Sequence, residues 1–231
     1  MLETFADGLF IADGEIVDFH GFPYPTRMAV ADLGSGRLWV WSPVRLTPAL
    51  RDDIEEIGSP HYLVSPNRLH HLYLGEWADA FPEAKLYGPA STIRKRTDLA
   101  FEAPLTDAPP AAWADSFDHA VFSGSPLFDE VIFFHRASRT VIIGDMSEHF
   151  SDAFLEAHWP GWKRGLARLW GITEGRGLAP LEIRATTVRR APARRMRATM
   201  LGWPADNVLM AHGVPVKGEG RAYLARAFAW I

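Results

Sequence analysis

Short apolar runs separated by turn residues fill the first half of the chain. Met28–Leu33 and Leu38–Trp41 flank a Gly-Ser-Gly turn, a pattern typical of a β-hairpin. Farther along, Tyr62–Val64 and Lys85–Tyr87 predict two short buried strands, and Leu69–Phe81 between them has helical spacing. This alternation of strands and helices favours an α/β architecture, in which polar side chains gather where strands end.

Apolar strands continue through the middle of the chain, and helical spacing dominates the last third. Glu130–Phe134 and Thr140–Ile143 are spaced like consecutive strands joined by a turn. From Ser151 to Leu201 the pattern is helical, and Val208–Ala211 predicts one more strand before a C-terminal helix. The arginines of the helical part are scattered and lack interleaved aromatic residues, which favours a solvated helix face over a nucleic-acid surface.

Composition narrows the chemistry that such a fold can carry. The 231 residues include nine His and no Cys, which excludes disulfides, thiolate metal sites and cysteine nucleophiles. The net charge is −4, and the chain shows neither a secretory signal nor an apolar run of about 18 residues. We therefore expect a cytoplasmic protein that binds a small-molecule substrate or ligand rather than nucleic acid or a membrane. The oligomeric state stays open.

Three predicted strands run directly into side chains of the kind that bind metals. His70 and His71 follow the first strand, Asp145 follows the second, and His212 follows the third. If these strand ends meet at one edge of the sheets, the four side chains converge on a single cleft and can bind one ion. The alternative is a metal-free pocket in which the same side chains hydrogen-bond one another.

Several short motifs occur in a recognisable order along nearly the whole chain. They are Arg27-Met28, Leu38-Trp39-Val40, Ser42-Pro43-Val44, Pro66-Asn67 with His70-His71, Glu130–His135 with Ser138-Arg139-Thr140, and Ala211-His212-Gly213. In this order they resemble the metallo-β-lactamase-like superfamily, and within it a branch of domains of unknown function. The resemblance implies one domain over residues 1–231. It also implies a four-layer αββα sandwich, in which helices cover two facing sheets and the site opens along one sheet edge.

The sequence departs from the ligand pattern of that superfamily. The signature His-x-His-x-Asp-His falls on Pro66, Arg68, His70 and His71, so its first two His ligands are absent. A further His, usual within a Gly-rich turn, is absent near Ser123. The resemblance implies that His71, Asp145 and His212 occupy the second-metal positions and that His70 replaces an Asp. We therefore expect one divalent metal, Zn²⁺ before Fe²⁺ or Mn²⁺, with a metal-free site as the alternative.

The resemblance implies a metal-dependent hydrolase acting on ester, thioester, lactone, amide or phosphodiester bonds. The expected metal ligands are His70, His71, Asp145 and His212, and the catalytic candidates are Asp145, Glu130 and Arg68. Glu130 begins its strand and is a candidate ligand or general base. Arg68 either pairs with Asp145 or an anionic substrate group or points to solvent, and the roles of Asn67 and His149 stay open. The alternative function is a non-catalytic ligand-binding or regulatory descendant of the fold.

Overall fold

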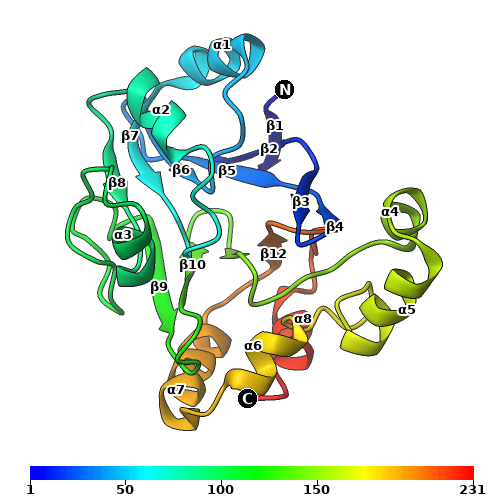
Figure 1. The fold of residues 1–231 in the computed structure, drawn as a ribbon. Coiled ribbons are helices and arrows are strands. Elements are labelled where there is room, and N and C mark those ends of the chain that lie inside the picture. Colours follow the sequence, from blue (N-terminus) through cyan, green and yellow to red (C-terminus); the bar gives the residue numbers. More distant parts are fainter.

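The computed structural model describes all 231 residues, and two β-sheets form its centre (Figure 1). The larger sheet has six strands in the order β1 (Glu3–Ala6), β2 (Leu9–Asp13), β5 (Arg27–Asp32), β6 (Arg37–Trp41), β7 (Ser59–Val64) and β8 (Lys85–Tyr87). The smaller has four in the order β12 (Asn207–Met210), β11 (Thr140–Ile143), β10 (Glu130–His135) and β9 (Phe117–Phe122). A separate hairpin consists of β3 (Val17–Phe19) and β4 (Phe22–Tyr24).

The apolar residues of the strands divide into layers because successive side chains of a strand point to opposite faces. Trp39 and Trp41 of β6 pack between the sheets against Phe133 of β10. The alternate residue Val40 faces the outer side of the larger sheet, and Ile132 faces the outer side of the smaller one. Each sheet is therefore apolar on both faces, and each outer face needs a helical cover.

Helices supply that cover on both sides (Figure 1). The larger sheet packs against α1 (Pro48–Ile57) and α2 (Leu74–Ala80), and the smaller against α6 (Leu181–Thr186), α7 (Arg190–Gly202) and α8 (Gly220–Ala227). The helix α3 (Ala90–Lys95) follows β8, while α4 (Asp152–His158) and α5 (Gly161–Trp170) pack with the β3–β4 hairpin. This arrangement is the expected αββα sandwich. No helix combines the length and apolar character needed to cross a bilayer.

The structure confirms the predicted hairpin but not the predicted start of the helix after Tyr62–Val64. β5 and β6 pair in antiparallel fashion around the Gly-Ser-Gly turn, which confirms the hairpin. The helix expected over Leu69–Phe81 begins only at Leu74, so its predicted start is wrong. The Asn67 side-chain oxygen accepts hydrogen bonds from the backbone N–H groups of Leu69 and His70, at 2.8 and 3.3 Å. The backbone bonds from His70 to Asn67 and from Leu74 to His71 span three residues rather than four, so the segment before α2 is an irregular series of turns.

The strands that precede the candidate ligands end at one edge of the molecule. β11 and β12 are parallel neighbours, with Ile143 opposite Met210, so their carboxyl ends lie side by side. A bridge between Asn67, beyond β7, and Glu130, at the start of β10, joins the larger sheet to the smaller at this edge. Loops that follow neighbouring parallel strands meet, and side chains distant in sequence are thereby brought together.

Candidate metal centre

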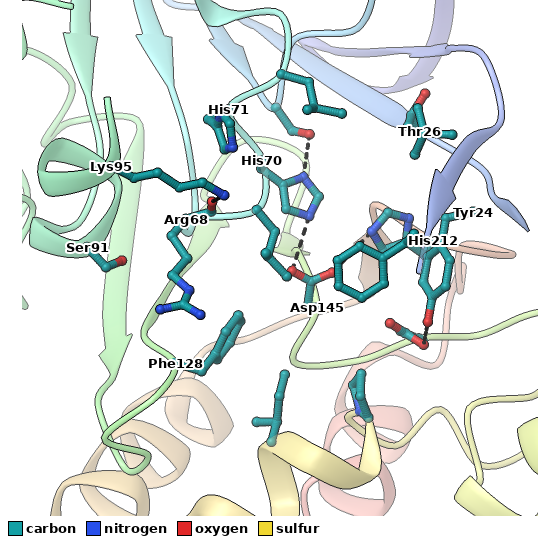
Figure 2. A pocket seen from close by; sticks show the side chains of 18 of the residues that line it. Tyr24, Thr26, Arg68, His70, His71, Ser91, Lys95, Phe128, Asp145 and His212 are labelled. Atoms are coloured by element: carbon teal, nitrogen blue, oxygen red, sulfur yellow. Dashed lines mark hydrogen bonds and ion pairs between the residues drawn. The ribbon is translucent and has the colours of Figure 1, made fainter. Parts of the chain in front are cut away.

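Three side chains converge at this edge, and Figure 2 shows them in the centre of a pocket. His70 Nε2 lies 3.4 Å from Asp145 Oδ2, and His212 Nε2 lies 3.1 Å from Asp145 Oδ1. One ligand atom from each residue lies within 4.8 Å of the others, so one ion can contact all three. The side chains are 7–8% exposed, which limits competition from bulk water. We call His70, Asp145 and His212 the triad.

The hydrogen bond made by the other nitrogen of His212 determines what its Nε2 can do. His212 Nδ1 lies 2.7 Å from the main-chain oxygen of Pro25, and because a carbonyl only accepts, Nδ1 must carry the proton. The Nε2 of a neutral ring then directs a lone pair at the Asp145 carboxylate. Two acceptors in contact require a proton or a metal ion between them. Two imidazoles and one carboxylate are a donor set that suits a divalent transition metal, so these residues fit one.

Ser42 holds the ring of His70 from the side opposite Asp145. Ser42 Oγ lies 2.7 Å from His70 Nδ1, and the Trp41 ring lies 5.9 Å from the His70 ring between centroids. Ser42 has a positive φ of 50° directly after β6, a conformation that is uncommon for a residue with a side chain. Ser42 is part of the sequence motifs, but those motifs give it no role. Its position directly after a buried strand is the signal that could have identified it as a site residue.

Two buried polar residues, Asn67 and Glu130, hold Asp145 in place from the protein interior. Asn67 Nδ2 donates to Glu130 Oε2 and to Asp145 Oδ2, both at 2.8 Å. Glu130 also accepts from the backbone N–H groups of Gly144, Asp145 and Met146, at 3.0, 2.7 and 3.3 Å. Glu130 is fully buried and does not line the pocket. In contrast to the sequence-based expectation of a ligand or general base, the structure makes Glu130 an anchor of the Asp145 loop.

The two carboxyl groups have opposite pKa shifts. Burial and the negative charge of Asp145 raise the pKa of Glu130, and the hydrogen bonds from the Asp145 N–H, Asn67 and the Met146 N–H oppose that rise. Burial also opposes ionisation of Asp145. The charge of His70 and the close contacts of His212 and His70 nevertheless hold the pKa of Asp145 well below its usual range. Asp145 is therefore the carboxylate available as a ligand.

His71 lies outside the triad, so the structure does not bring all four expected ligands together. Figure 2 shows its ring set apart from the three side chains of the triad, and its Nδ1 is buried without a hydrogen-bond partner. Burial and the charges of Lys95 and Arg96 lower the pKa of His71 to about 4, so it is neutral at pH 7. The physical reason is the irregular turn, because consecutive residues there direct their rings apart. His149 also lies outside the triad. Its Nδ1 contacts the Val214 carbonyl, and its Nε2 accepts from the Gly175 N–H.

The triad opens into a cavity of about 870 Å³, which is within the usual range for small-molecule sites. Tyr24 and Glu148 line one side, and the Tyr24 hydroxyl donates to Glu148 Oε2 at 3.3 Å. Burial, together with the charge of Asp145, raises the pKa of Glu148. Arg68 also lines the cavity, is exposed, and forms no ion pair with Asp145. The sequence patterns missed Tyr24 and Glu148, although Glu148 follows Asp145 by three residues in the same loop.

Solved structures of metallo-β-lactamases match this chain from end to end. DIM-1 metallo-β-lactamase exposed to ceftazidime is 14% identical, with a TM-score of 0.65, over 100% of this chain and 95% of its own. The enzyme from Pontibacter korlensis is 11% identical, with a TM-score of 0.64, over 100% and 97%. FIM-1 from Pseudomonas aeruginosa, in its mono-zinc form, is 12% identical, with a TM-score of 0.59, over 100% and 96%. The chain therefore has the metallo-β-lactamase-like fold.

A family model identifies the branch within this fold. The model described as Domain of unknown function (DUF4336) matches residues 18–157, which include His70 and Asp145. The chain belongs to this family. No curated protein sequence matches it.

Proposed function

We propose that this protein is a hydrolase that uses one divalent metal ion held by His70, Asp145 and His212. The contact that carries the proposal is the one between His212 Nε2 and Asp145, 3.1 Å apart, because the Pro25 carbonyl fixes the proton on the other ring nitrogen. Three protein ligands leave a position for water or substrate, as in catalytic rather than structural zinc sites. Zn²⁺ is the proposed ion, with Fe²⁺ or Mn²⁺ as alternatives suited to the same ligands.

The residues around the triad have roles that suit hydrolysis. A divalent ion held by the triad would supply Lewis acidity, which lowers the pKa of a water and polarises a carbonyl or phosphoryl oxygen of the substrate. Ser42 and the Pro25 carbonyl orient the two imidazoles, and Asn67 orients the carboxylate. Glu148 lies in the same cavity, and its raised pKa lets it retain a proton for a leaving group.

The proposal of one ion rather than two rests on which residues surround the triad. Pro66 and Arg68 stand where the superfamily signature has two further His, and neither can ligate a metal. The triad is the one group of three or more candidate metal-binding side chains in the structure. The same loss of ligands is also compatible with a descendant that binds a ligand without catalysis, and the experiment must separate the two.

Metal analysis of purified protein tests the centre itself. After supplementation with Zn²⁺ and gel filtration, the wild-type protein should carry about one ion per chain, measured by elemental analysis. His70→Ala, Asp145→Ala and His212→Ala should each reduce this to roughly one tenth or less. His71→Ala should retain the metal because its ring lies outside the triad, and His158→Ala, at an exposed position, is the matched control. Equal metal content in all five variants would overturn the proposal.

Turnover separates a hydrolase from a ligand-binding descendant. The metal-loaded protein is offered ester, thioester, lactone, amide and phosphodiester substrates, and products are measured. Hydrolysis that disappears in His212→Ala and persists in His158→Ala supports the proposed activity. Full metal occupancy with no turnover on any of these bonds would favour the ligand-binding alternative.

A further inference from the structure

One side of the cavity carries three positive charges, from Arg68, Arg94 and Lys95. Arg68 lies in the turn after β7, and the other two lie in the last turn of α3. Figure 2 shows Arg68 and Lys95 on one side of Asp145, and Tyr24 and His212 on the other. We call Arg68, Arg94 and Lys95 the basic wall.

The charges of the basic wall have no carboxylate partner. No ion pair in the structure involves Arg68, Arg94 or Lys95. The neighbouring Arg96 is different, since its guanidinium lies 2.6 Å from Asp98. The unpaired ones face the cavity that contains the triad.

Two residues of the basic wall are in direct contact. Lys95 Nζ donates to the main-chain oxygen of Arg68 at 3.1 Å. Partial burial and the charge of Arg68 lower the pKa of Lys95, which means that its positive charge is disfavoured as the site stands. Like charges held together repel, and an anion between them relieves that repulsion. The ammonium and the guanidinium fork also offer the donors that phosphate and carboxylate oxygens accept.

We propose that the basic wall binds an anionic group of the substrate, a phosphate or a carboxylate, beside the triad. The placement of the scissile bond at the triad rests on the proposed hydrolase function, whereas the anion site itself does not. Glu182 lines the cavity too, and its charge disfavours an anion near it. Electrostatics therefore orient the substrate, with its anionic group toward Arg68 and Lys95. Apolar side chains of the same cavity, such as Phe128 and Ile183, suit its uncharged part.

Binding of small anions to metal-free protein tests the wall without any catalytic readout. Inorganic phosphate and succinate are titrated separately into protein stripped with a chelator, and binding is measured by calorimetry. Removal of the metal prevents either probe from binding to the ion instead. The probe with the higher affinity identifies the anion as phosphate or carboxylate. Added KCl should weaken the binding because salt screens partly exposed charges.

Variants locate the bound anion. Arg68→Ala and Lys95→Ala should each weaken it about tenfold, and Arg68→Lys should be intermediate because lysine keeps the charge but loses the guanidinium fork. Arg221→Ala is the matched control, since Arg221 is exposed on α8 and does not line the cavity. Arg68 and Lys95 are themselves exposed, so their truncation leaves the core packing intact. No measurable binding of either probe, or equal affinity in all variants, overturns the inference.

Zn²⁺ content measured on the same proteins separates this inference from the proposed function. Zn²⁺ binding that is unchanged in Arg68→Ala, together with lost anion binding, supports both. Anion binding that depends on Arg68 in a protein with no Zn²⁺ affinity keeps the anion site and removes the hydrolase proposal. Zn²⁺ binding without anion binding that depends on the basic wall keeps the proposed metal centre and removes the anion site.

Discussion

Asn67 lies between two buried carboxyl groups and donates one amide hydrogen to each, to Glu130 and to Asp145, at 2.8 Å. Buried charges are tolerated only where their lone pairs are satisfied. Both Glu130 oxygens accept from donors, and Asp145 has His70 and His212 on its outer side. The position of the candidate metal ligand is therefore set by side chains that never reach the cavity.

The substitution Glu130→Gln tests this support. Both carboxylate oxygens accept hydrogen bonds from N–H donors, so the amide NH₂ of glutamine would face a donor in either orientation. We expect the free energy of unfolding, measured with urea, to fall by about 3 kcal/mol. The Zn²⁺ affinity, measured by calorimetry, should fall about 10- to 100-fold because Asp145 loses its anchor.

The control for that substitution is Glu56→Gln on the exposed face of α1. It should change the free energy of unfolding by less than about 0.5 kcal/mol. If Glu130→Gln were as stable as this control and bound Zn²⁺ as well as the wild type, Glu130 would not position Asp145.

The limits of sequence-based prediction at the residue scale are clearest at His70 and His71. Both follow the same strand and both are plausible ligands, and only the turn geometry set by Asn67 and Ser65 separates them. Those bonds are side-chain contacts within an irregular segment, which hydrophobic periodicity does not describe. Tyr24 was missed for another reason: its strand has three residues of intermediate burial and no alternation.

At the element scale, the parallel pair of β11 and β12 brings Asp145 and His212 together. The apolar runs predicted both strands. In the structure the four residues of β11 are all buried, as is typical of a strand covered on both faces. Their adjacency in the sheet was not predictable from these runs, because nothing in the runs encodes which strand lies beside which. The resemblance to a known fold supplied that step, and the structure confirms the fold.

The loop after β12 depends on a glycine. Gly213 has a φ of 105°, and a Cβ there would lie 2.1 Å from the His149 main-chain oxygen. The His149 N–H donates to the His212 carbonyl at 3.0 Å, so this loop and the one after Asp145 are joined at that point. Gly213→Ala should force the two loops apart, lower the free energy of unfolding by about 3 kcal/mol and weaken Zn²⁺ binding.

Urea denaturation and Zn²⁺ calorimetry measure both effects of Gly213→Ala. The matched control is Gly165→Ala within α5, where a Cβ would meet no atom within 4 Å. Alanine is the better helix former, so the control should be more stable by up to about 1 kcal/mol. A Gly213→Ala protein with wild-type stability would show that the close approach is not required.

At the scale of the whole molecule, stability should depend on pH through buried neutral histidines. Burial lowers the pKa of His135 to about 4. Between about pH 6.5 and 4 the unfolded chain therefore binds a proton that the native protein does not, and stability falls as the pH falls. The contribution of His135 is up to about 3 kcal/mol, and it is fully present above pH 6.5. Urea denaturation at several pH values measures it.

The matched variants are His135→Gln and the exposed His158→Gln. His135→Gln removes the titrating group, so its stability should change less between pH 7 and 4 than that of the wild type. His158→Gln should keep the wild-type dependence. Parallel pH profiles for all three proteins would show that His135 does not titrate differently in the two states.

Metal binding should also stabilise the whole fold, because the triad joins loops that follow three separate strands. A ligand that binds only the native state adds RT ln(1 + [L]/Kd), or about 2.7 kcal/mol at a hundredfold excess over Kd. For a chain of this length that corresponds to a rise in Tm of about 5–10 °C, measured by thermal denaturation. His212→Ala should show no rise, and His158→Ala should respond like the wild type. Mg²⁺ should have little effect, since it prefers oxygen ligands over imidazole. An equal rise for His212→Ala would place the stabilising ion elsewhere on the protein.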